Sequence, residues 1–339
     1  MGDEVRVLAA LLTAFAITLL ATPIARRIAL RAGFFDHPVG YKGHSNPTPY
    51  LGGAAVIAGI AAGILIFGAA QDYTRLLVAA LVIFAIGTLD DRIQLGVTLR
   101  LIAQVLTAIA CWTVDLGWTM LGTDTANLAL TIVWVVGITN AFNLIDNQDG
   151  AAGTVGAVSS VGIGTLALIH GAVPLAVIAF SVSGACLAFL RYNLAKPASI
   201  FLGDGGSMPI GLLVACTVMA IPDGVLDWTL LFATAPLVGL PILDTTLVVI
   251  SRLRRGAPIL SGGRDHLTHR LLGMVGSERS VALILAAAQA VLCGLSIALF
   301  HVDQAAVLAA TAVYLTIGAA SIALLETMAL APAAKERAS

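Results

Sequence analysis

The chain has 339 residues, of which 59% are hydrophobic and 11% are charged, and its mean hydropathy is +0.97. An ordinary soluble domain has roughly 45–50% apolar and about 25% charged residues, so this composition excludes that class and predicts a multispanning membrane protein. The net charge of -1 is uninformative, because the charge asymmetry of such a protein lies across the membrane and not in the sum. We expect no binding to nucleic acid. The four cysteines are isolated in apolar segments without metal or redox spacing, which predicts small core residues: Cys111, Cys186, Cys216 and Cys293.

Apolar runs close to the roughly 20 residues that a helix needs to cross the hydrocarbon core recur along the whole chain. In chain order the predicted spans are 5–25, 51–70, 74–90, 97–115, 126–145, 151–169, 173–191, 206–222, 227–251, 279–300 and 304–327. A closed β-barrel would instead show short alternating segments. We therefore predict an all-α integral membrane protein with about 11 transmembrane helices, as one catalytic domain over 1–330 with a short cytoplasmic tail at 331–339.

The distribution of basic residues predicts the orientation in the membrane. The first apolar run follows the acidic start "MGDEV" and precedes Arg26, Arg27 and Arg31, which is typical of a retained span and opposite to a signal peptide. If the connection 26–50 is cytoplasmic, all of the 18 Lys and Arg residues except Arg6 and Arg75 lie on the cytoplasmic side. The N-terminus is then outside and the C-terminus cytoplasmic.

Polar residues gather in the connections assigned to the cytoplasm. Five of these connections are rich in Asp, His, Asn, Lys and Gly, and they cover 36–53, 87–92, 140–153, 199–207 and 261–270. The outer connections are short and ordinary. This distribution predicts one active site built at the cytoplasmic face from loops that are distant in sequence.

Two of these segments carry oxygen ligands. Asp90 and Asp91 end the third span, where the helix dipole is already negative and adjacent carboxylates repel each other. A solvated helix end is the simpler interpretation, and a pair placed for a metal or for general-base work is the alternative. In "NAFNLIDNQDGAAG", helical spacing places Asn143, Asp146 and Asp149 near one face. Helix-ending signals explain the "DG" but not the deeper residues, and oxygen ligands of this kind suit Mg²⁺ or Mn²⁺.

The segment "GDGGS" opens the eighth span. Asp204 or Ser207 is expected to cap that helix. Gly203, Gly205 and Gly206 would let the backbone approach a ligand closely, and free N–H groups at a helix start favour phosphate oxygens. No GK[ST] follows, so the loop is not a Walker A motif.

Two histidines follow the ninth span in "GRDHLTHR". His266 and His269 are three residues apart and are flanked by Arg264 and Arg270. Zinc binding would need a further ligand, for which His44 is the only helper. We favour an anion-binding cluster for a pyrophosphate, with Arg as the donor fork and His as a proton donor.

One acid, Asp244, lies inside the ninth span, where a charge costs a few kcal/mol unless it is paired, protonated or hydrated. Backbone groups released by Pro241 and the hydroxyls of Thr245 and Thr246 are candidates to satisfy it. The sequence leaves open whether Asp244 serves the structure or the substrate.

Five motifs occur in one order and together carry a family resemblance. They are "KGH…P.P.LGG" at 42–53, "DD" at 90–91, "NAFNLIDNQDG" at 140–150, "FLGDGGS" at 201–207 and "GRDHLTHRLL" at 263–272. Any one of them alone is weak. Together they resemble the polyprenyl-phosphate N-acetylhexosamine-1-phosphate transferases, integral membrane enzymes with ten or eleven helices that start cell-envelope glycans.

The resemblance implies a reaction and assigns residues to it. A sugar 1-phosphate would pass from a UDP-sugar to a polyprenyl phosphate, giving UMP, with Mg²⁺ or Mn²⁺ required, at a bacterial plasma membrane. The acidic pair Asp90 and Asp91 would lie near the acceptor phosphate, with Asp90 favoured as the base. Asp204 and Asn143 would hold the metal, and His266 would act in catalysis. The residues that would bind substrate are Lys42, His44, Asp146, Asn147, Asp149, Phe201 (against the uracil), Arg264 and His269.

Alternatives remain open at this stage. The branch of the family that transfers phospho-MurNAc-pentapeptide carries a denser run of histidines, so "DHLTHRLL" and "PILDT" favour UDP-GlcNAc. Departures at Asn147, where glycine is common, and at Tyr41 and Tyr50, where basic residues are frequent, put single contacts in doubt. A secondary transporter would show acids near the midplane and paired halves. Faces rich in Ala and Gly permit packing within one chain or a homodimer.

Overall fold

The computed structural model describes residues 2–36, 47–68, 70–222, 227–259 and 262–336. Lys42, His44 and Tyr41 lie outside these ranges. Within them the elements are α1 (Asp3–Ala32), β1 (Phe35–Asp36), β2 (Thr48–Pro49), α2 (Gly52–Phe67), α3 (Ala70–Ile93), α4 (Val97–Trp112), α5 (Asp124–Ile145), α6 (Ala151–Ile169), α7 (Val173–Asn193), α8 (Asp204–Met219), η1 (Asp227–Thr229), α9 (Leu230–Thr234), η2 (Ala235–Val238), α10 (Gly239–Arg255), α11 (Leu267–Val275), α12 (Glu278–Leu299) and α13 (Gln304–Glu336).

The prediction of an all-α membrane protein is confirmed. Seven helical segments in the described ranges are long and apolar enough to cross a membrane, and α2, α4 and α8 are shorter apolar helices. Each predicted span overlaps one of these segments or α3. The number of helices that cross the bilayer and the positions of the two termini relative to it stay predictions.

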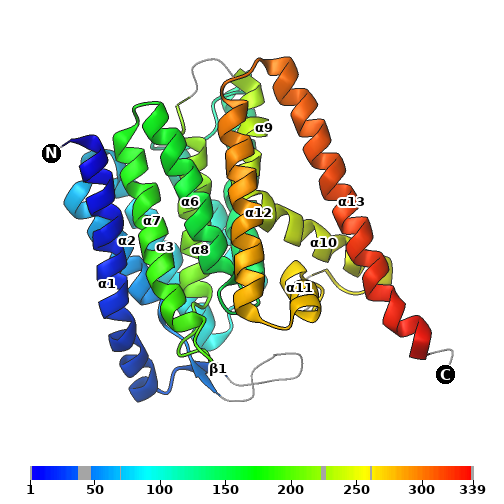
Figure 1. Cartoon of the computed structure of the whole chain (residues 1–339). Coiled ribbons are helices and arrows are strands. Elements are labelled where there is room, and N and C mark those ends of the chain that lie inside the picture. The colour runs from blue at the N-terminus through cyan, green and yellow to red at the C-terminus, as the bar shows by residue number, and fades with distance from the viewer. Residues whose placement is uncertain (1, 37–46, 69, 223–226, 260–261, 337–339) are drawn as a thin grey trace.

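The ninth predicted span, 227–251, is not one regular helix. It consists of η1, α9 and η2 followed by α10. Pro236 lies in η2, and because proline lacks an N–H group it removes a helical hydrogen bond at this point. After this break α10 runs obliquely to the upright helices of the bundle (Figure 1).

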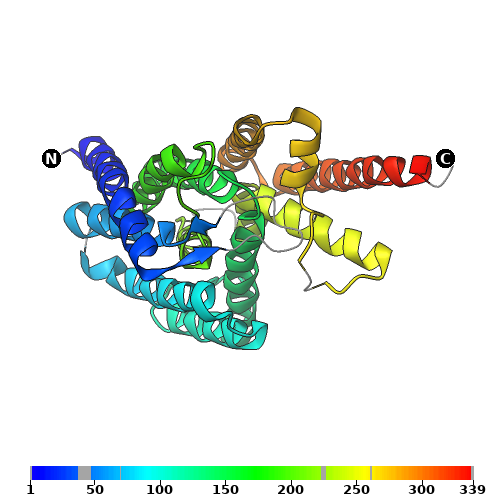
Figure 2. The ribbon, with the colours of Figure 1, turned by 90° about the horizontal axis from the view of Figure 1, so that it is seen from below.

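Helix α8 forms the centre of the bundle. All its residues from Gly205 to Met219 are buried, which is expected for a helix that is apolar on every side. It packs against α3 and α5, and its first residue is Asp204. The first turn of α8, which carries this residue, therefore lies at one end of the bundle. Figure 2 shows the ribbon from below.

Two short strands lie at the same end of the bundle as α11 (Figure 1). β1 and β2 pair antiparallel, with Phe35 opposite Pro49 and Asp36 opposite Thr48. This pairing brings the segment that follows α1 back to the start of α2. The motif at 47–53 therefore reaches the end of the bundle where α8 begins.

Candidate active site

The polar stretch 140–153 connects four other helices. Besides local bonds such as those of Asn140 to Val136 O and of Asn147 to Leu144 O, several of its bonds join α5 or the following loop to elements distant in sequence. The bonds run from Asn140 to Gln104 of α4, from Asn143 to Asp204 and Ser207 of α8, from Thr268 of α11 to the Asn147 side-chain oxygen, and from the Gly150 N–H to Asn193 of α7.

Asp90 and Asp204 are joined by an arginine that the sequence analysis missed. The Arg100 Nη1 lies 2.9 Å from Asp90 Oδ2 and 2.9 Å from Asp204 Oδ2. The other oxygen of Asp204 accepts a hydrogen bond of 2.8 Å from the Asn143 amide. The structure thus brings together three predicted residues from three segments. A lone cation one turn inside the apolar run 97–115 was the available signal for Arg100.

Asp91, unlike its neighbour Asp90, contacts the backbone at the start of α8. Its two carboxylate oxygens accept the N–H groups of Asp204 at 3.0 Å and of Gly205 at 3.1 Å. Asp91 therefore caps α8, and the expectation that Asp204 or Ser207 provides this cap is wrong. These two N–H groups are engaged by a carboxylate, so they are not open to a phosphate as the sequence suggested.

The glycines of "LGG" and "GDGG" serve helix packing. A Cβ on Gly53 would lie 2.5 Å from the backbone of Gly205 and Gly206, and one on Gly205 would lie 2.3 Å from Thr88 Oγ1. Gly203 has φ +73° and lies directly against Asp91. The close backbone approach that the motif permits in this structure is therefore between α2, α3 and α8, and the predicted approach to a ligand stays a prediction.

The donor set at the start of α8 fits a hard cation. Asp90 Oδ1 is buried and has no hydrogen-bond partner among the described residues. Carboxylate and amide oxygens are the ligands that Mg²⁺ uses, and Mg²⁺ often binds through one or two carboxylates together with substrate phosphates. Within the described ranges no three His, Cys, Asp or Glu side chains form a cage by themselves. The arrangement therefore suits an ion that shares its ligands with substrate.

Asp146 adds negative charge to this region. It is half-buried at the C-terminal end of α5. Burial raises its pKa well above the usual range, and the carboxylates of Asp204, Asp91 and Asp149 raise it further. Asp146 therefore lies within electrostatic range of Asp204 at the start of α8 and of Asp91.

Phe201 lies beside the segment that opens α2. Its N–H donates to Pro49 O at 2.9 Å, and its carbonyl accepts from Gly52 N at 3.0 Å. The Tyr50 and Phe201 rings have centroids 6.0 Å apart. The two motifs at 47–53 and 201–207 are therefore one structural unit, with Phe201 half-buried.

The histidine segment is tied to the buried acid of α10. His266 Nδ1 lies 2.8 Å from Asp244 Oδ2, and the Leu267 N–H donates to Asp244 Oδ1 at 2.6 Å. The expectation that Thr245 and Thr246 satisfy Asp244 is wrong. The Thr246 hydroxyl donates to Ile242 O, and within the described chain Thr245 Oγ1 has no partner.

The other members of the predicted anion cluster divide into two groups. His269 lies beside His266 with ring centroids 6.1 Å apart, and burial, then the charges of His266 and Arg264, lower its pKa. Arg264 is exposed. Arg270 is instead bound to α13, since its guanidinium donates to Glu326 Oε1 at 2.6 Å and to Leu325 O at 2.6 Å.

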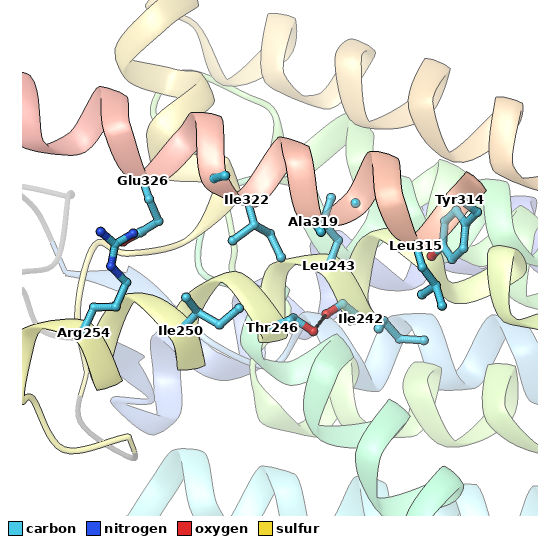
Figure 3. Close-up of a pocket in the computed structure, with 12 residues that line it drawn as sticks. Ile242, Leu243, Thr246, Ile250, Arg254, Tyr314, Leu315, Ala319, Ile322 and Glu326 are labelled. Atoms are coloured by element: carbon cyan, nitrogen blue, oxygen red, sulfur yellow. Dashed lines mark hydrogen bonds and ion pairs between the residues drawn. The ribbon is translucent and has the colours of Figure 1, made fainter. Parts of the chain in front are cut away.

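An apolar groove of about 380 Å³ lies between α10 and α13 (Figure 3). Leu243 and Ile322 line it, and Tyr314 lies at one end. At the other end, Arg254 Nη1 is 3.6 Å from Glu326 Oε2. The groove is open, and its middle is lined mainly by aliphatic side chains.

The chain is similar to one known protein family and to several named proteins. The model of glycosyl transferase family 4 matches residues 73–221. The chain is 33% identical over 300 residues to the probable undecaprenyl-phosphate N-acetylglucosaminyl 1-phosphate transferase of Bacillus subtilis, covering 84% of this chain and 83% of the relative. It is 34% identical over 316 residues to the decaprenyl-phosphate N-acetylglucosaminephosphotransferase of Mycolicibacterium smegmatis, covering 81% and 77%.

A third relative is more distant. The undecaprenyl-phosphate alpha-N-acetylglucosaminyl 1-phosphate transferase of Escherichia coli is 30% identical over 299 residues, which cover 82% of this chain and 80% of the relative. The similarity extends over most of each chain and confirms the family that the five motifs predict. The chain belongs to glycosyl transferase family 4, among the polyprenyl-phosphate N-acetylhexosamine-1-phosphate transferases.

Proposed function

We propose that this protein transfers N-acetylglucosamine 1-phosphate from UDP-GlcNAc to a polyprenyl phosphate, giving polyprenyl-diphospho-GlcNAc and UMP. The observation that carries the proposal is the cluster of Asp90, Arg100, Asn143 and Asp204 at the start of α8, in a chain of this family. The named activities of the relatives in Bacillus, Mycolicibacterium and Escherichia support the sugar.

The reaction exchanges one phosphoanhydride bond for another. An oxygen of the lipid phosphate forms a bond to the β-phosphorus of UDP-GlcNAc, the bond from that phosphorus to the bridging oxygen breaks, and UMP leaves with the electron pair. Asp90 takes the remaining proton of the acceptor phosphate, because its Oδ1 is buried without a partner in the described chain. Catalysis of this kind is mostly positioning and neutralisation of charge.

Asp204 and Asn143 are the residues that would hold Mg²⁺, or Mn²⁺ in its place. When bound, such an ion offsets the negative charge of the sugar nucleotide diphosphate. Arg100 holds Asp90 and Asp204 in place, and Asp91 fixes the end of the helix that carries Asp204. The acidic cluster is thus held together by contacts within the chain.

The sugar nucleotide would lie between two motifs. Phe201, with Lys42, Asn147 and Asp149, is assigned to the nucleotide, and Arg264, His266 and His269 to the diphosphate and sugar. His44 is a further expected substrate contact. Asn147 supports this division, because its side chain accepts a hydrogen bond from Thr268 and so joins the loop after α5 to α11. The polyprenyl chain needs an apolar surface, and the groove between α10 and α13 offers one.

We place the protein in the bacterial plasma membrane with its site facing the cytoplasm, because the five polar segments and most basic residues share one predicted side. The second candidate, transfer of phospho-MurNAc-pentapeptide, differs only in the sugar that the histidine segment meets.

The direct test follows the β-phosphorus of UDP-GlcNAc from the sugar nucleotide to the lipid. UDP-GlcNAc labelled with ³²P in its β-phosphate should transfer the label to a butanol-extractable lipid in the presence of polyprenyl phosphate and Mg²⁺. Asp204→Asn should lower this transfer by more than about 100-fold while the protein stays folded. Gly137→Ala, at an open and exposed position of α5, is the control. Near-normal transfer by Asp204→Asn would remove Asp204 from the reaction.

A further inference from the structure

Asp244 is a fully buried carboxylate in a segment predicted to lie in the membrane. It is 0% exposed, and its partner His266 is 4% exposed. A carboxylate in such surroundings is costly unless donors satisfy it. Both of its oxygens are satisfied by the start of α11, one by the imidazole and one by the Leu267 N–H. No residue of its own helix takes part in these bonds.

The bond to Leu267 fixes a helix end. Leu267 is the first residue of α11, and the N–H groups of a first turn have no partner within their own helix. His266 occupies the N-cap position but makes no side-chain capping bond. Asp244 therefore caps α11 from a different helix, and its negative charge suits a helix N-terminus. This contact fixes α11 relative to α10.

The hydrogen bond to His266 determines which ring nitrogen of the imidazole carries the proton. An ionised carboxylate only accepts hydrogen bonds, and opposite such a group the ring nitrogen 2.8 Å away carries the hydrogen. The proton of the neutral imidazole then lies on Nδ1, and Nε2 is the nitrogen available to another partner. Asp244 consequently sets the tautomer of His266 as well as its orientation.

We propose that Asp244 is the positioning residue of His266: it keeps the proton on Nδ1 and so directs Nε2 to the diphosphate of the sugar nucleotide. The substrate in this inference rests on the proposed function, whereas the relation between the carboxylate and the imidazole does not. The role explains why an acid is kept inside a predicted span, a question that the sequence leaves open.

Asp244→Asn is the variant that tests this role. Its amide oxygen can still accept the Leu267 N–H, but its NH₂ group then faces Nδ1 and favours a proton on Nε2. We expect kcat for UMP release to fall by about 10²–10⁴-fold, the contribution of a positioned acid or base, with little change in KM for UDP-GlcNAc. Thr245→Val is the matched control, because it removes a buried hydroxyl that has no partner in the described chain, and its kcat should be unchanged.

The tautomer itself is measured by NMR of the full-length protein labelled with ¹⁵N-histidine, with His266→Gln to assign the signal among the six histidines. The expected result is an Nδ1–H signature for His266 in the wild type and an Nε2–H signature in Asp244→Asn. An Nε2–H signature in the wild type overturns the proposal, and this decides the matter alone if Asp244→Asn does not fold.

Two further results would also overturn it. One is a kcat of Asp244→Asn equal to that of Thr245→Val. The other is a fall in kcat with the Nδ1–H tautomer retained, which would assign Asp244 to the helix cap alone. If the wild type releases no UMP, the proposed function fails, while the spectra still test the contact between Asp244 and His266.

Discussion

Three carboxylates meet around the start of α8, and Arg100 is the cation that bridges two of them. Such a site costs stability, because like charges and burial both oppose ionisation. Clusters with this property are typical of functional sites. Asp146 belongs to the same region, and its pKa is raised by burial first and then by Asp204 and Asp91.

The raised pKa of Asp146 gives a prediction with a definite sign. Such a group costs the folded protein no stability below its unfolded pKa of about 3.9. The protein loses stability as the pH rises from there through the higher folded pKa, because the folded state then opposes ionisation of the carboxyl. Asp146→Asn cannot ionise, so we expect it to raise the melting temperature, and to do so more at about pH 8 than at about pH 5. Thermal unfolding in detergent at the two pH values measures the difference.

Asp115→Asn is the control for this measurement. Asp115 is exposed and has φ +60°, which asparagine tolerates, so the substitution removes one charge outside the acidic cluster. A stabilisation by Asp146→Asn that is equal at both pH values, or larger at the lower one, would contradict the account.

Phe201 carries the prediction for nucleotide binding. The loss of its ring in Phe201→Ala should remove about 1–3 kcal/mol of stacking on a base. KM for UDP-GlcNAc should therefore rise by about 10-fold or more, with a smaller change in KM for the polyprenyl phosphate. Steady-state kinetics with each substrate varied in turn give both values, and an unchanged nucleotide KM would rule out the stacking role.

For single residues, the sequence predicts which residue types belong to the site better than it predicts which side chains contact one another. Asp90, Asn143 and Asp204 were assigned to one site because oxygen ligands stood out in an apolar chain, and the structure brings them together. Arg100 and the pair of Asp244 and His266 were not foreseen as contacts. The hydropathy of an apolar segment predicts that its helix spans the membrane. It does not predict which neighbouring helix packs against each face.

Helix α8 shows how glycines place a functional end. It is buried on all sides, and α2 and α3 approach its first turn so closely that Gly53 and Gly205 have no room for a Cβ. Small residues of this kind let helices in membranes approach closely. The position of Asp204 relative to Asp90 therefore depends on backbone contacts as well as on side chains.

Gly53→Ala tests the contact between α2 and α8. The added Cβ would lie 2.5 Å from backbone atoms of Gly205 and Gly206, which cannot move aside as a side chain would. Overpacking of this kind costs about 1–3 kcal/mol, so the melting temperature should fall. Turnover should fall as well, because the carboxylate of Asp204 moves with the helix.

Gly137→Ala is the matched control, since a Cβ there meets nothing within 4 Å. In a helix interior this change is neutral or stabilising. Equal melting temperatures for the two variants would show that α2 and α8 are not in tight contact.

The elements themselves follow closely from the sequence, because runs of apolar residues leave helices as the natural way to satisfy the backbone in a membrane. The break in the ninth span was not predicted. Hydropathy continues across 227–251, whereas Pro236 and the 3₁₀ turn around it change the direction of the chain. A pattern of hydropathy alone carries no information on such a bend.

The last helix, α13, packs against the rest of the described chain through few buried residues. The apolar window of α13 is only 11% buried. Glu326 is an exception: it is 6% exposed, accepts from Arg270 at 2.6 Å and pairs with Arg254 at one end of the groove (Figure 3). This carboxylate joins α13 to α10 and to the helix that follows His266.

Glu326→Gln should therefore destabilise the protein by about 1.5–3 kcal/mol, the usual contribution of a hydrogen bond to a charged group. Thermal unfolding measures the loss. Glu278→Gln is the control, because Glu278 pairs with Lys196 at a more exposed position, where ion pairs contribute little. An equal effect of the two substitutions would show that Glu326 does not anchor α13.

The most direct test of the whole account is UMP release by purified protein in detergent with undecaprenyl phosphate and Mg²⁺, with UDP-GlcNAc compared with UDP-MurNAc-pentapeptide. We predict release with UDP-GlcNAc alone, lost on chelation of the metal and in the Asp90→Asn control. Release with UDP-MurNAc-pentapeptide alone would contradict the assigned sugar. If neither donor yields UMP and the protein binds no nucleotide, the proposal of a sugar-phosphate transferase is contradicted as a whole.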